Sequence, residues 1–246
     1  MRLLLFFSFI LTGFVAHSQK GIRESCEITT PPVIDGVATE WTSDWNLDGE
    51  SKILYTICND AENLYIRLKI TDNLTQTKIG LYGLYVKLDA NGKKKGKVGL
   101  KYPVGKADSE LKKQKPLDLP DAAAVDAYKR QLLSDVEVVE LVGLAKENII
   151  SSRLGLMNGI EAFIAADADA NYIYEAKIPF KAFKIEKAKT PILGVTIETG
   201  RQTTANQPNG STPPPSGFGQ RGGGFGGGGY SVMAVPAYLW VGVKLK

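Results

Sequence analysis

Apolar and polar side chains alternate along much of the chain, which is typical of β-strands buried on one face. Residues 63–71 show the pattern most clearly, because every second side chain from Leu64 to Ile70 is apolar. The pattern predicts strands over 52–58, 63–71, 82–90, 97–102, 135–142, 149–157, 160–166, 171–178, 191–199 and 236–245. We expect the first four to pair in antiparallel order, since turn-forming residues at 59–62 and at 91–92 separate them.

One segment has the pattern of a helix. Pro120 precedes residues 121–133, which form the only convincing helix that the sequence predicts beyond the first 18 residues. Together with the irregular, Lys-rich stretch before it, this helix makes a predicted insertion over 105–133. About ten strands and one short inserted helix predict a mostly β protein, an antiparallel β-sandwich of the immunoglobulin-like or jelly-roll-like kind.

A glycine- and proline-rich tract of low complexity spans residues 201–230. Such a composition cannot bury enough apolar surface to order the backbone, so we expect a disordered, flexible loop. If this tract were a linker between two domains, the strand predicted over 236–245 would stand alone after it, without a strand to pair with. The tract is therefore expected to lie inside one domain and not between two.

The first residues predict a cleavable signal peptide. Arg2 precedes an almost wholly apolar run from Leu3 to Val15, and small residues follow it. We expect residues 1–18 to be removed, which leaves 19–246 as a single exported domain in the periplasm or outside the cell. The apolar run is shorter than the about 20 residues that span a bilayer, and no later stretch replaces it. No transmembrane segment is expected in the mature chain.

Charge and histidine content exclude several classes of function. Lys and Arg number 30 and Asp and Glu 26, which is an ordinary surface balance, so we expect no nucleic-acid partner. The sole histidine, His17, lies in the predicted signal peptide. Without an imidazole, the mature chain has neither a Ser-His-Asp nor a Cys-His centre nor a histidine-ligated metal site. The sequence predicts no catalytic residue.

Two cysteines, Cys26 and Cys58, lie close to the first predicted strands. In an oxidising compartment they either form a disulfide or remain two separate buried thiols. Their spacing in the sequence does not decide between these alternatives, because a bridge requires the two Cβ atoms to face each other.

Four short segments carry recognisable motifs. They are Pro32–Gly36 with Glu40-Trp41, Asp60–Ile66 closing on Thr71–Asn73, Leu84–Asp89, and Tyr174–Phe180. In this order they resemble the family 9 carbohydrate-binding module and its DOMON-like relatives. The resemblance implies a β-sandwich and the binding of sugars. DOMON-like relatives also include haem-binding electron carriers, and without histidine a haem here would need a methionine such as Met157 or Met233 as an axial ligand, which is a minor alternative.

The chain departs from that family at two places. Sugar-binding members usually carry a tryptophan after the second of these segments, whereas residues 72–83 contain Tyr82 as their one aromatic residue. The acidic strand familiar from the family is replaced by residues 80–85, and both of its carboxylates are lost. The ligand and calcium sites of the family therefore cannot be transferred to these positions.

Sugar binding requires flat aromatic side chains, because the apolar face of a pyranose stacks on a ring while polar neighbours take its hydroxyls. Trp41 and Trp45 lie four residues apart in an irregular segment and are candidates for such a surface, with covering the end of the sandwich as the alternative. Tyr82 and Tyr85 form a further option. Trp240 alternates with apolar neighbours in a predicted strand, and we expect it in the core.

No cofactor is predicted. Residues 167–171 resemble the start of a calcium loop, but Tyr172 and Ile178 stand where an EF-hand requires glycine and glutamate. We expect a solvated hairpin turn there, and a calcium site of another kind stays open.

The leading hypothesis is a secreted, non-catalytic carbohydrate-binding module that recognises a glycan, such as a polysaccharide, by stacking near Trp41 and Trp45. The alternative is a structural or interaction protein of the cell envelope, which keeps the sandwich but has no sugar site and binds another polypeptide.

Overall fold

The computed structural model describes residues 21–37, 40–41, 43–113, 120–134, 136–144, 149–203 and 229–246. The predicted signal peptide and most of the predicted flexible loop, residues 204–228, lie outside this part of the chain.

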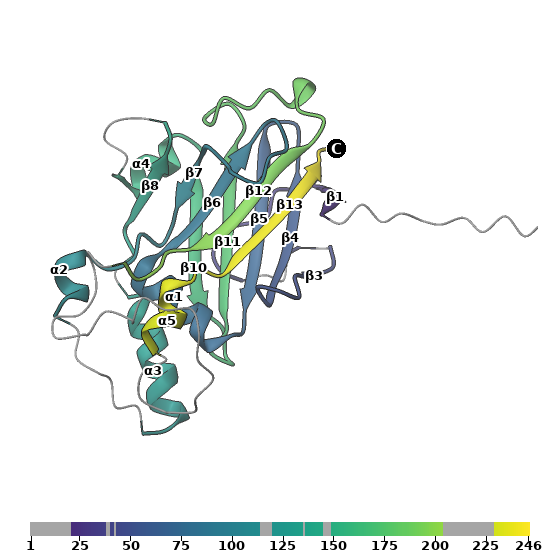
Figure 1. The fold of residues 1–246 in the computed structure, drawn as a ribbon. Helices are drawn as coiled ribbons and strands as arrows, with labels where there is room; N and C mark the ends of the chain where they lie inside the picture. Colours follow the sequence, from purple (N-terminus) through teal and green to yellow (C-terminus); the bar gives the residue numbers. More distant parts are fainter. Residues whose placement is uncertain are drawn as a thin grey trace, which may run out of the picture.

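Two β-sheets face each other across the molecule (Figure 1). The strands are β1 (Ile22–Glu24), β2 (Cys26–Glu27), β3 (Asn46–Leu47), β4 (Ile53–Asn59), β5 (Asn63–Ile70), β6 (Leu84–Asp89), β7 (Val98–Lys101), β8 (Val138–Val142), β9 (Ile149–Ser151), β10 (Glu161–Ala166), β11 (Tyr172–Pro179), β12 (Leu193–Thr199) and β13 (Tyr238–Lys244). In the described residues, the seven-stranded sheet has the order β1-β13-β12-β6-β7-β8-β9. The six-stranded sheet has the order β10-β11-β5-β4-β2, and β3 also pairs with β4.

Helices gather mainly at one end of the two sheets (Figure 1). They are α1 (Asn73–Tyr82), α2 (Asp108–Leu111), α3 (Ala122–Leu132), α4 (Ser152–Met157), α5 (Gly229–Ala234) and the 3-10 helix η2 (Lys187–Lys189). No helix in the described ranges is long and apolar enough to cross a bilayer. The position of α3 confirms the helix predicted over 121–133.

One hydrophobic core lies between the sheets and receives side chains from both. The contributing side chains include Leu84, Val86, Leu88, Val195, Ile197, Leu239 and Val241 from one sheet, and Ile57, Leu64, Ile66, Leu68, Tyr172, Tyr174 and Ile178 from the other. Burial of each large aliphatic side chain contributes about 1.5–3 kcal/mol, so the alternation along the strands stabilises the facing sheets. The predicted β-sandwich is confirmed.

The predicted pairing of the early strands is only partly right. β4 and β5 form one antiparallel hairpin and β6 and β7 form another. However, β5 belongs to the six-stranded sheet and β6 to the seven-stranded sheet, so the two hairpins do not pair with each other. The helix α1 carries the chain from one sheet to the other.

Helix α1 is absent from the elements predicted by the sequence. The helix begins after Asp72, whose side chain accepts hydrogen bonds from the backbone N–H (2.9 Å) and the hydroxyl (2.8 Å) of Thr75. It ends at Gly83, which adopts φ +88° and donates its N–H to the carbonyl of Ile79 at 2.8 Å. Most side chains from Thr75 to Tyr82 are buried, so the segment lacks the polar stripe by which amphipathic helices are recognised.

We expect Asp72→Ala to lower the free energy of unfolding by about 1 kcal/mol, because the substitution removes the side-chain cap of α1. Denaturant titration of the purified protein measures this change. Asp72→Asn retains an acceptor oxygen and is expected to retain most of the stability. An alanine variant as stable as the wild type would show that the cap does not stabilise the fold.

Other differences concern the short elements. The strand predicted over 149–157 is β9 followed by α4, because the side chain of Ser151 accepts the N–H of Leu154 at 3.2 Å and starts a helix. The short strands β1 and β2 were not predicted, and both pair in parallel, β1 with β13 and β2 with β4. The other strand pairings among the described residues are antiparallel, as expected for this sandwich.

Candidate functional site

The outer face of the six-stranded sheet lies under residues 28–37, 40–41 and 43–47, which we call the N-terminal cover. A disulfide joins Cys26, two residues before this cover, to Cys58 in β4, so the first of the two alternatives for these cysteines is the one observed. The hydroxyl of Thr56 donates to the carbonyl of Asp44 at 3.0 Å and ties the far part of the cover to the same strand.

Glu175 holds the middle of the N-terminal cover. Its carboxylate accepts hydrogen bonds from Trp41 Nε1 (2.8 Å) and from the backbone N–H groups of Gly36 (2.8 Å) and Asp35 (3.1 Å). The pKa of this carboxyl group is raised, mainly by burial and in small part by the charge of Asp35. The three hydrogen bonds act in the opposite direction and offset only part of the effect. The acidic residue of the fourth motif therefore binds the first motif, and both have a structural role.

Arg67 lies beside Glu175 and is only 3% exposed. It faces Glu175 directly in the register between β5 and β11. Its Nε donates to the hydroxyl of Thr56 at 3.1 Å, and its Nη2 donates to the carbonyl of Ser43. Burial lowers the pKa of the guanidinium, and the charges of Glu175 and Asp44 oppose that effect.

Trp41 and Trp45 both contact Arg67. The guanidinium carbon lies 5.3 Å from the ring centroid of Trp41 and 4.0 Å from that of Trp45. Trp41 is 8% exposed and also packs against Cys58 and Tyr65, whereas Trp45 is half-buried. The geometry therefore favours the alternative role predicted for Trp41 and Trp45, in which their rings cover the sandwich. Trp41 has little free surface for a sugar.

The second motif is structural as well. Asp60 accepts the backbone N–H groups of Glu62 (2.7 Å) and Asn63 (2.6 Å) and the hydroxyl of Tyr65 (2.7 Å). Burial raises the pKa of Asp60, but these hydrogen bonds outweigh it and the net pKa lies below the usual value. The carboxylate thus fixes the hairpin turn between β4 and β5.

The outer face of the seven-stranded sheet has a different character. Residues directly opposite one another in the register form a row across five strands, which consists of Glu140, Lys101, Tyr85, Glu198 and Tyr238. All five side chains are partly or largely exposed. Charged and aromatic side chains therefore alternate across this face, an arrangement suited to a polar ligand with one apolar side.

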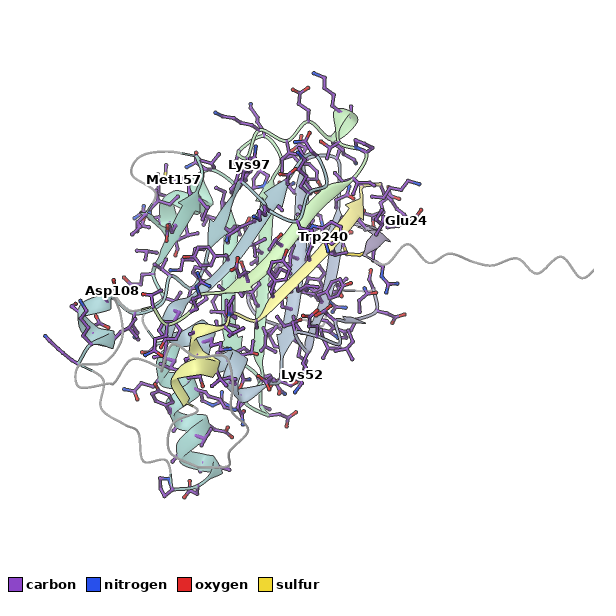
Figure 2. The ribbon with its side chains drawn as sticks, viewed as in Figure 1. Glu24, Lys52, Lys97, Asp108, Met157 and Trp240 are labelled. Atoms are coloured by element: carbon purple, nitrogen blue, oxygen red, sulfur yellow. A yellow bond between two sulfur atoms is a disulfide. The ribbon has the colours of Figure 1, made fainter. Side chains whose placement is uncertain are left out.

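Trp240 belongs to this outer face, so the prediction that it lies in the core is wrong. Its neighbours Leu239 and Val241 point into the core, and Trp240 therefore points outward, where it is partly exposed (Figure 2). Its Nε1 donates to the carbonyl of Lys93 at 3.2 Å, and Lys94 Nζ lies 5.3 Å from the ring centroid. The loop after β6 thus folds over this tryptophan.

A cleft of about 320 Å³ opens on the outer face next to this row. It is lined by Tyr82, Tyr85, Lys87, Lys101, Lys106, Asp108, Leu111, Glu198, Thr199, Gly200, Arg201 and Thr203. The walls come from β6, β7, the end of β12 and α2, which carries Asp108 at the edge of the molecule (Figure 2). The predicted insertion 105–133 therefore contributes one wall of the cleft.

Close backbone contacts fix the floor of the cleft. The N–H of Gly200 donates to the carbonyl of Gly83 at 2.8 Å, and a Cβ atom on Gly200 would lie 2.0 Å from the carbonyl oxygen of Tyr82. The N–H of Lys106 donates to the carbonyl of Leu81 at 2.8 Å. Glycine is therefore required at position 200 to bring three distant segments together at this point.

Tyr85 stands at the centre of the cleft's charged groups. Lys87 Nζ lies 4.6 Å and Lys101 Nζ 4.9 Å from the centroid of its ring. Lys87 also forms an ion pair of 2.8 Å with Glu198. Burial raises the pKa of Tyr85, and the charges of Glu140 and Glu198 add to that effect, so the phenol is neutral at physiological pH.

The structure thus separates the four candidate aromatic residues. Trp41 and Trp45 lie under or within the N-terminal cover, whereas Tyr82 and Tyr85 both line the cleft on the opposite sheet. Tyr82 is mostly buried and packs with Leu81, Leu111 and Leu132 behind the cleft.

Several polar residues of the cleft were not singled out in the sequence. Lys87 and Glu198 occupy outward positions of alternating strands, so alternation could have placed each on an exposed face. It could not have placed them together, because the pairing of β6 with β12 joins segments that are far apart in the sequence. The same holds for Lys101 and Arg201.

The remaining candidates are not arranged as a cofactor site. Asp167 accepts the N–H groups of Asp169 (3.0 Å) and Asn171 (2.8 Å) and forms an ion pair with Lys69 at 3.3 Å, as in the predicted hairpin turn. Met157 lies exposed on α4, and Met233 packs beside the Leu81 cluster. In the part of the chain that the structure describes, no three His, Cys, Asp or Glu side chains are grouped to hold a metal ion.

Comparison with known proteins gives no family assignment from sequence: no protein-family model matches the chain, and neither does any curated protein. Solved structures that align with most of the chain include two of a carbohydrate-binding module of family 9 from Caldicellulosiruptor kristjanssonii. The complex with glucose is 12% identical, with 91% of this chain and 95% of that chain covered and a TM-score of 0.36. The complex with cellotriose is 13% identical, with 91% and 93% covered and a TM-score of 0.36. Both belong to the family that the four sequence segments resemble.

Proposed function

We propose that this protein is an exported, non-catalytic carbohydrate-binding module, and that it binds a glycan in the cleft on the outer face of the seven-stranded sheet. The observation that carries the proposal is the cleft itself, in which Tyr85 is surrounded by charged and hydroxyl groups. A pyranose has an apolar face that stacks on an aromatic ring and a rim of hydroxyls that hydrogen-bond to polar groups.

The described residues around Tyr85 supply both kinds of group. Asp108 offers a carboxylate acceptor, Lys101 and Lys106 offer ammonium donors, and the ion pair of Lys87 with Glu198 lies beside the ring. On the opposite face the N-terminal cover buries Trp41, which is 8% exposed at the wall of a cleft of about 400 Å³ and offers little ring surface for stacking. We assign Trp41 and Trp45 to holding that cover and Tyr85 to contact with the ligand.

Export is part of the proposal. The disulfide between Cys26 and Cys58 supports it, since structural disulfides persist in oxidising compartments such as the periplasm or the extracellular space. The proposal keeps residues 19–246 as one domain, with the insertion 105–133 as part of the site.

Tyr85→Ala is expected to weaken glycan binding about tenfold, because loss of an aromatic contact of about 1–2 kcal/mol changes the dissociation constant by roughly that factor. Tyr85→Phe keeps the ring and is expected to bind nearly as the wild type. Affinity electrophoresis of purified residues 19–246 against a panel of soluble polysaccharides measures these differences.

Phe163→Ala is the control for this experiment. Phe163 is an exposed aromatic residue on β10 of the six-stranded sheet, and it does not line the cleft. Its removal should leave binding unchanged. If no polysaccharide binds the folded protein, the proposed function is wrong; if both alanine variants weaken binding equally, the cleft is not the site.

The second candidate function is an interaction protein of the cell envelope. It is favoured by a group of exposed apolar side chains on β9 and α4, namely Ile149, Leu154, Leu156 and Met157. Met157 is 78% exposed and projects from the edge of the molecule (Figure 2). Apolar side chains grouped in this way are typical of protein contacts.

One pair of variants separates the two functions. Leu156→Lys with Met157→Lys should abolish recovery of a cross-linked envelope polypeptide if the second candidate holds, and Tyr85→Ala should not. The second candidate is contradicted if the wild type binds glycans and the double lysine variant recovers the same cross-linked polypeptides as the wild type.

A further inference from the structure

The lysines of the cleft differ from the other lysines that are at least half-buried. Outside the cleft, each of these lysines has a hydrogen-bond or ion-pair partner for its ammonium group. The pairs are Lys69 with Asp167, Lys78 with the carbonyl of Val235, Lys129 with Asp126, Lys177 with Glu161 and Lys187 with the carbonyl of Asp60. In the cleft, Lys87 has Glu198 as its partner. The ammonium groups of Lys101 and Lys106 have neither kind of partner among the described residues.

Of these two lysines, Lys101 is the one that contacts Tyr85. Its Nζ lies 4.9 Å from the centroid of the Tyr85 ring. Burial lowers the pKa of the ammonium group, although the charges of Glu140 and Asp108 act in the opposite direction. A partly dehydrated cation that contacts a ring but has no hydrogen-bond or ion-pair partner is stabilised further by an anion that can reach it.

The charge balance of the cleft favours an anion. Its lining carries four cationic side chains and two acidic ones, and Glu198 is already engaged by Lys87. The remaining carboxylate of the lining, Asp108, lies on α2 at the rim, and Glu140 lies opposite Lys101 on β8 outside the lining. Neither forms an ion pair with Lys101 in the described residues, and together they lower the positive potential only in part. The field at Lys101, Lys106 and Arg201 therefore attracts a negatively charged group.

We propose that the ligand of the cleft is an acidic saccharide, and that its carboxylate or sulfate group pairs with the ammonium group of Lys101. This inference rests on the proposed function, because it assumes that a sugar occupies the cleft. A carboxylate or sulfate stands directly outside the sugar ring, so a pyranose stacked on Tyr85 brings the anionic group next to Lys101. Lys106 lies within the same cleft and holds a further anionic group along the polymer.

The test compares three classes of soluble polysaccharide with purified residues 19–246. Hydroxyethyl cellulose is the neutral probe, polygalacturonate and alginate carry carboxylates, and carrageenan carries sulfate esters without carboxylates. We expect saturable binding to one or both acidic classes, with an affinity that falls as salt is raised from about 0.05 to 0.5 M because the charges are screened. Binding to uronates or to sulfated polymers identifies the anionic group.

Three variants connect binding to the site. Lys101→Met keeps the length of the side chain and removes the charge, and we expect it to weaken acidic-glycan binding at least tenfold. Lys101→Arg retains the charge and should retain most of the affinity. Lys181→Met removes the same charge from an exposed turn outside the cleft and should change affinity less than twofold. Thermal unfolding of each variant checks that the fold is intact.

Each outcome decides the proposal. Binding to the neutral polymer alone overturns this inference and leaves glycan binding in the cleft standing. Acidic-glycan binding that Lys101→Met and Lys181→Met weaken equally also overturns it, since a diffuse surface charge would then explain the attraction. Failure to bind any polymer overturns both this inference and the proposed function.

Discussion

Glu175→Ala is expected to lower the free energy of unfolding by about 3–5 kcal/mol. The carboxylate is fully buried and accepts three hydrogen bonds, from Trp41 Nε1 and from the N–H groups of Asp35 and Gly36. Alanine leaves these donors without their acceptor and removes from the buried guanidinium of Arg67 the larger of its two nearby acidic charges, while that of Asp44 remains. Removing one member of a buried charge arrangement is strongly destabilising, because the other charge stays out of water.

Equilibrium denaturation followed by tryptophan fluorescence measures this loss. Trp41 loses its hydrogen bond in the variant, so its emission should also shift before global unfolding. Glu175→Gln keeps an acceptor oxygen and is expected to lose less stability than alanine.

Glu161→Ala is the matched control for Glu175. Glu161 lies on the neighbouring strand β10 and pairs with Lys177 at 2.9 Å in a partly exposed position. Such a surface ion pair contributes about 0–1 kcal/mol. If Glu175→Ala is no more destabilising than this control, Glu175 does not hold the N-terminal cover.

Loss of the disulfide is expected to lower the free energy of unfolding by about 3–4 kcal/mol. Cys26 and Cys58 are 32 positions apart, and a bridge across a loop of this length restricts the unfolded chain by about that amount. The paired Cys26→Ser and Cys58→Ser variant removes the bridge without leaving a free thiol. Its denaturation midpoint, compared with that of the oxidised protein, measures the effect.

A reductant provides the control for the disulfide. It should destabilise the wild type to nearly the level of the double serine variant and leave that variant unchanged. A wild-type protein whose midpoint does not respond to full reduction, verified by thiol titration, would show that the bridge contributes little.

Strands that are buried on one face could be predicted from the sequence. In β5, Leu64, Ile66 and Leu68 point inward and their neighbours point outward, so alternation alone gave the strand and its buried face. In β13 the same rule, applied strictly, would have placed Trp240 outward, because its position is out of phase with Leu239 and Val241. The wrong prediction came from a preference for burying tryptophan.

The helix α1 could not be predicted from periodicity. Gln76 and Lys78 are buried in it, and the amide of Gln76 donates to the carbonyls of Ile70 (2.8 Å) and Ala170 (2.9 Å). Buried polar side chains whose donors bind distant carbonyls hide the apolar stripe of the helix. Asp72 was the available signal, since aspartate before a helix is a favoured cap.

The cleft could not be predicted for a reason of topology. Tyr85 and Glu198 face each other because β6 pairs with β12, and Lys101 joins them through the pairing of β6 with β7. Only the last pairing is a local hairpin. Residues that meet through long-range pairing leave no common motif in the sequence, whereas the motifs that do appear, such as Asp60 and Glu175, stabilise the fold.

The parallel pairing of β1 with β13 has a consequence for the order of folding. Ser25, which follows β1, contacts Lys244 at the end of β13 across a separation of 219 residues. The hairpin of β4 and β5 closes a short loop, but β1 gains its partner only after most of the polypeptide has been brought into position. Closing so long a loop costs conformational entropy, and the chain loses this entropy before the contact between β1 and β13 can stabilise the sheet. The edge of the seven-stranded sheet is thus completed late, and a nascent chain still lacking β13 presents β12 as an unprotected edge to its surroundings.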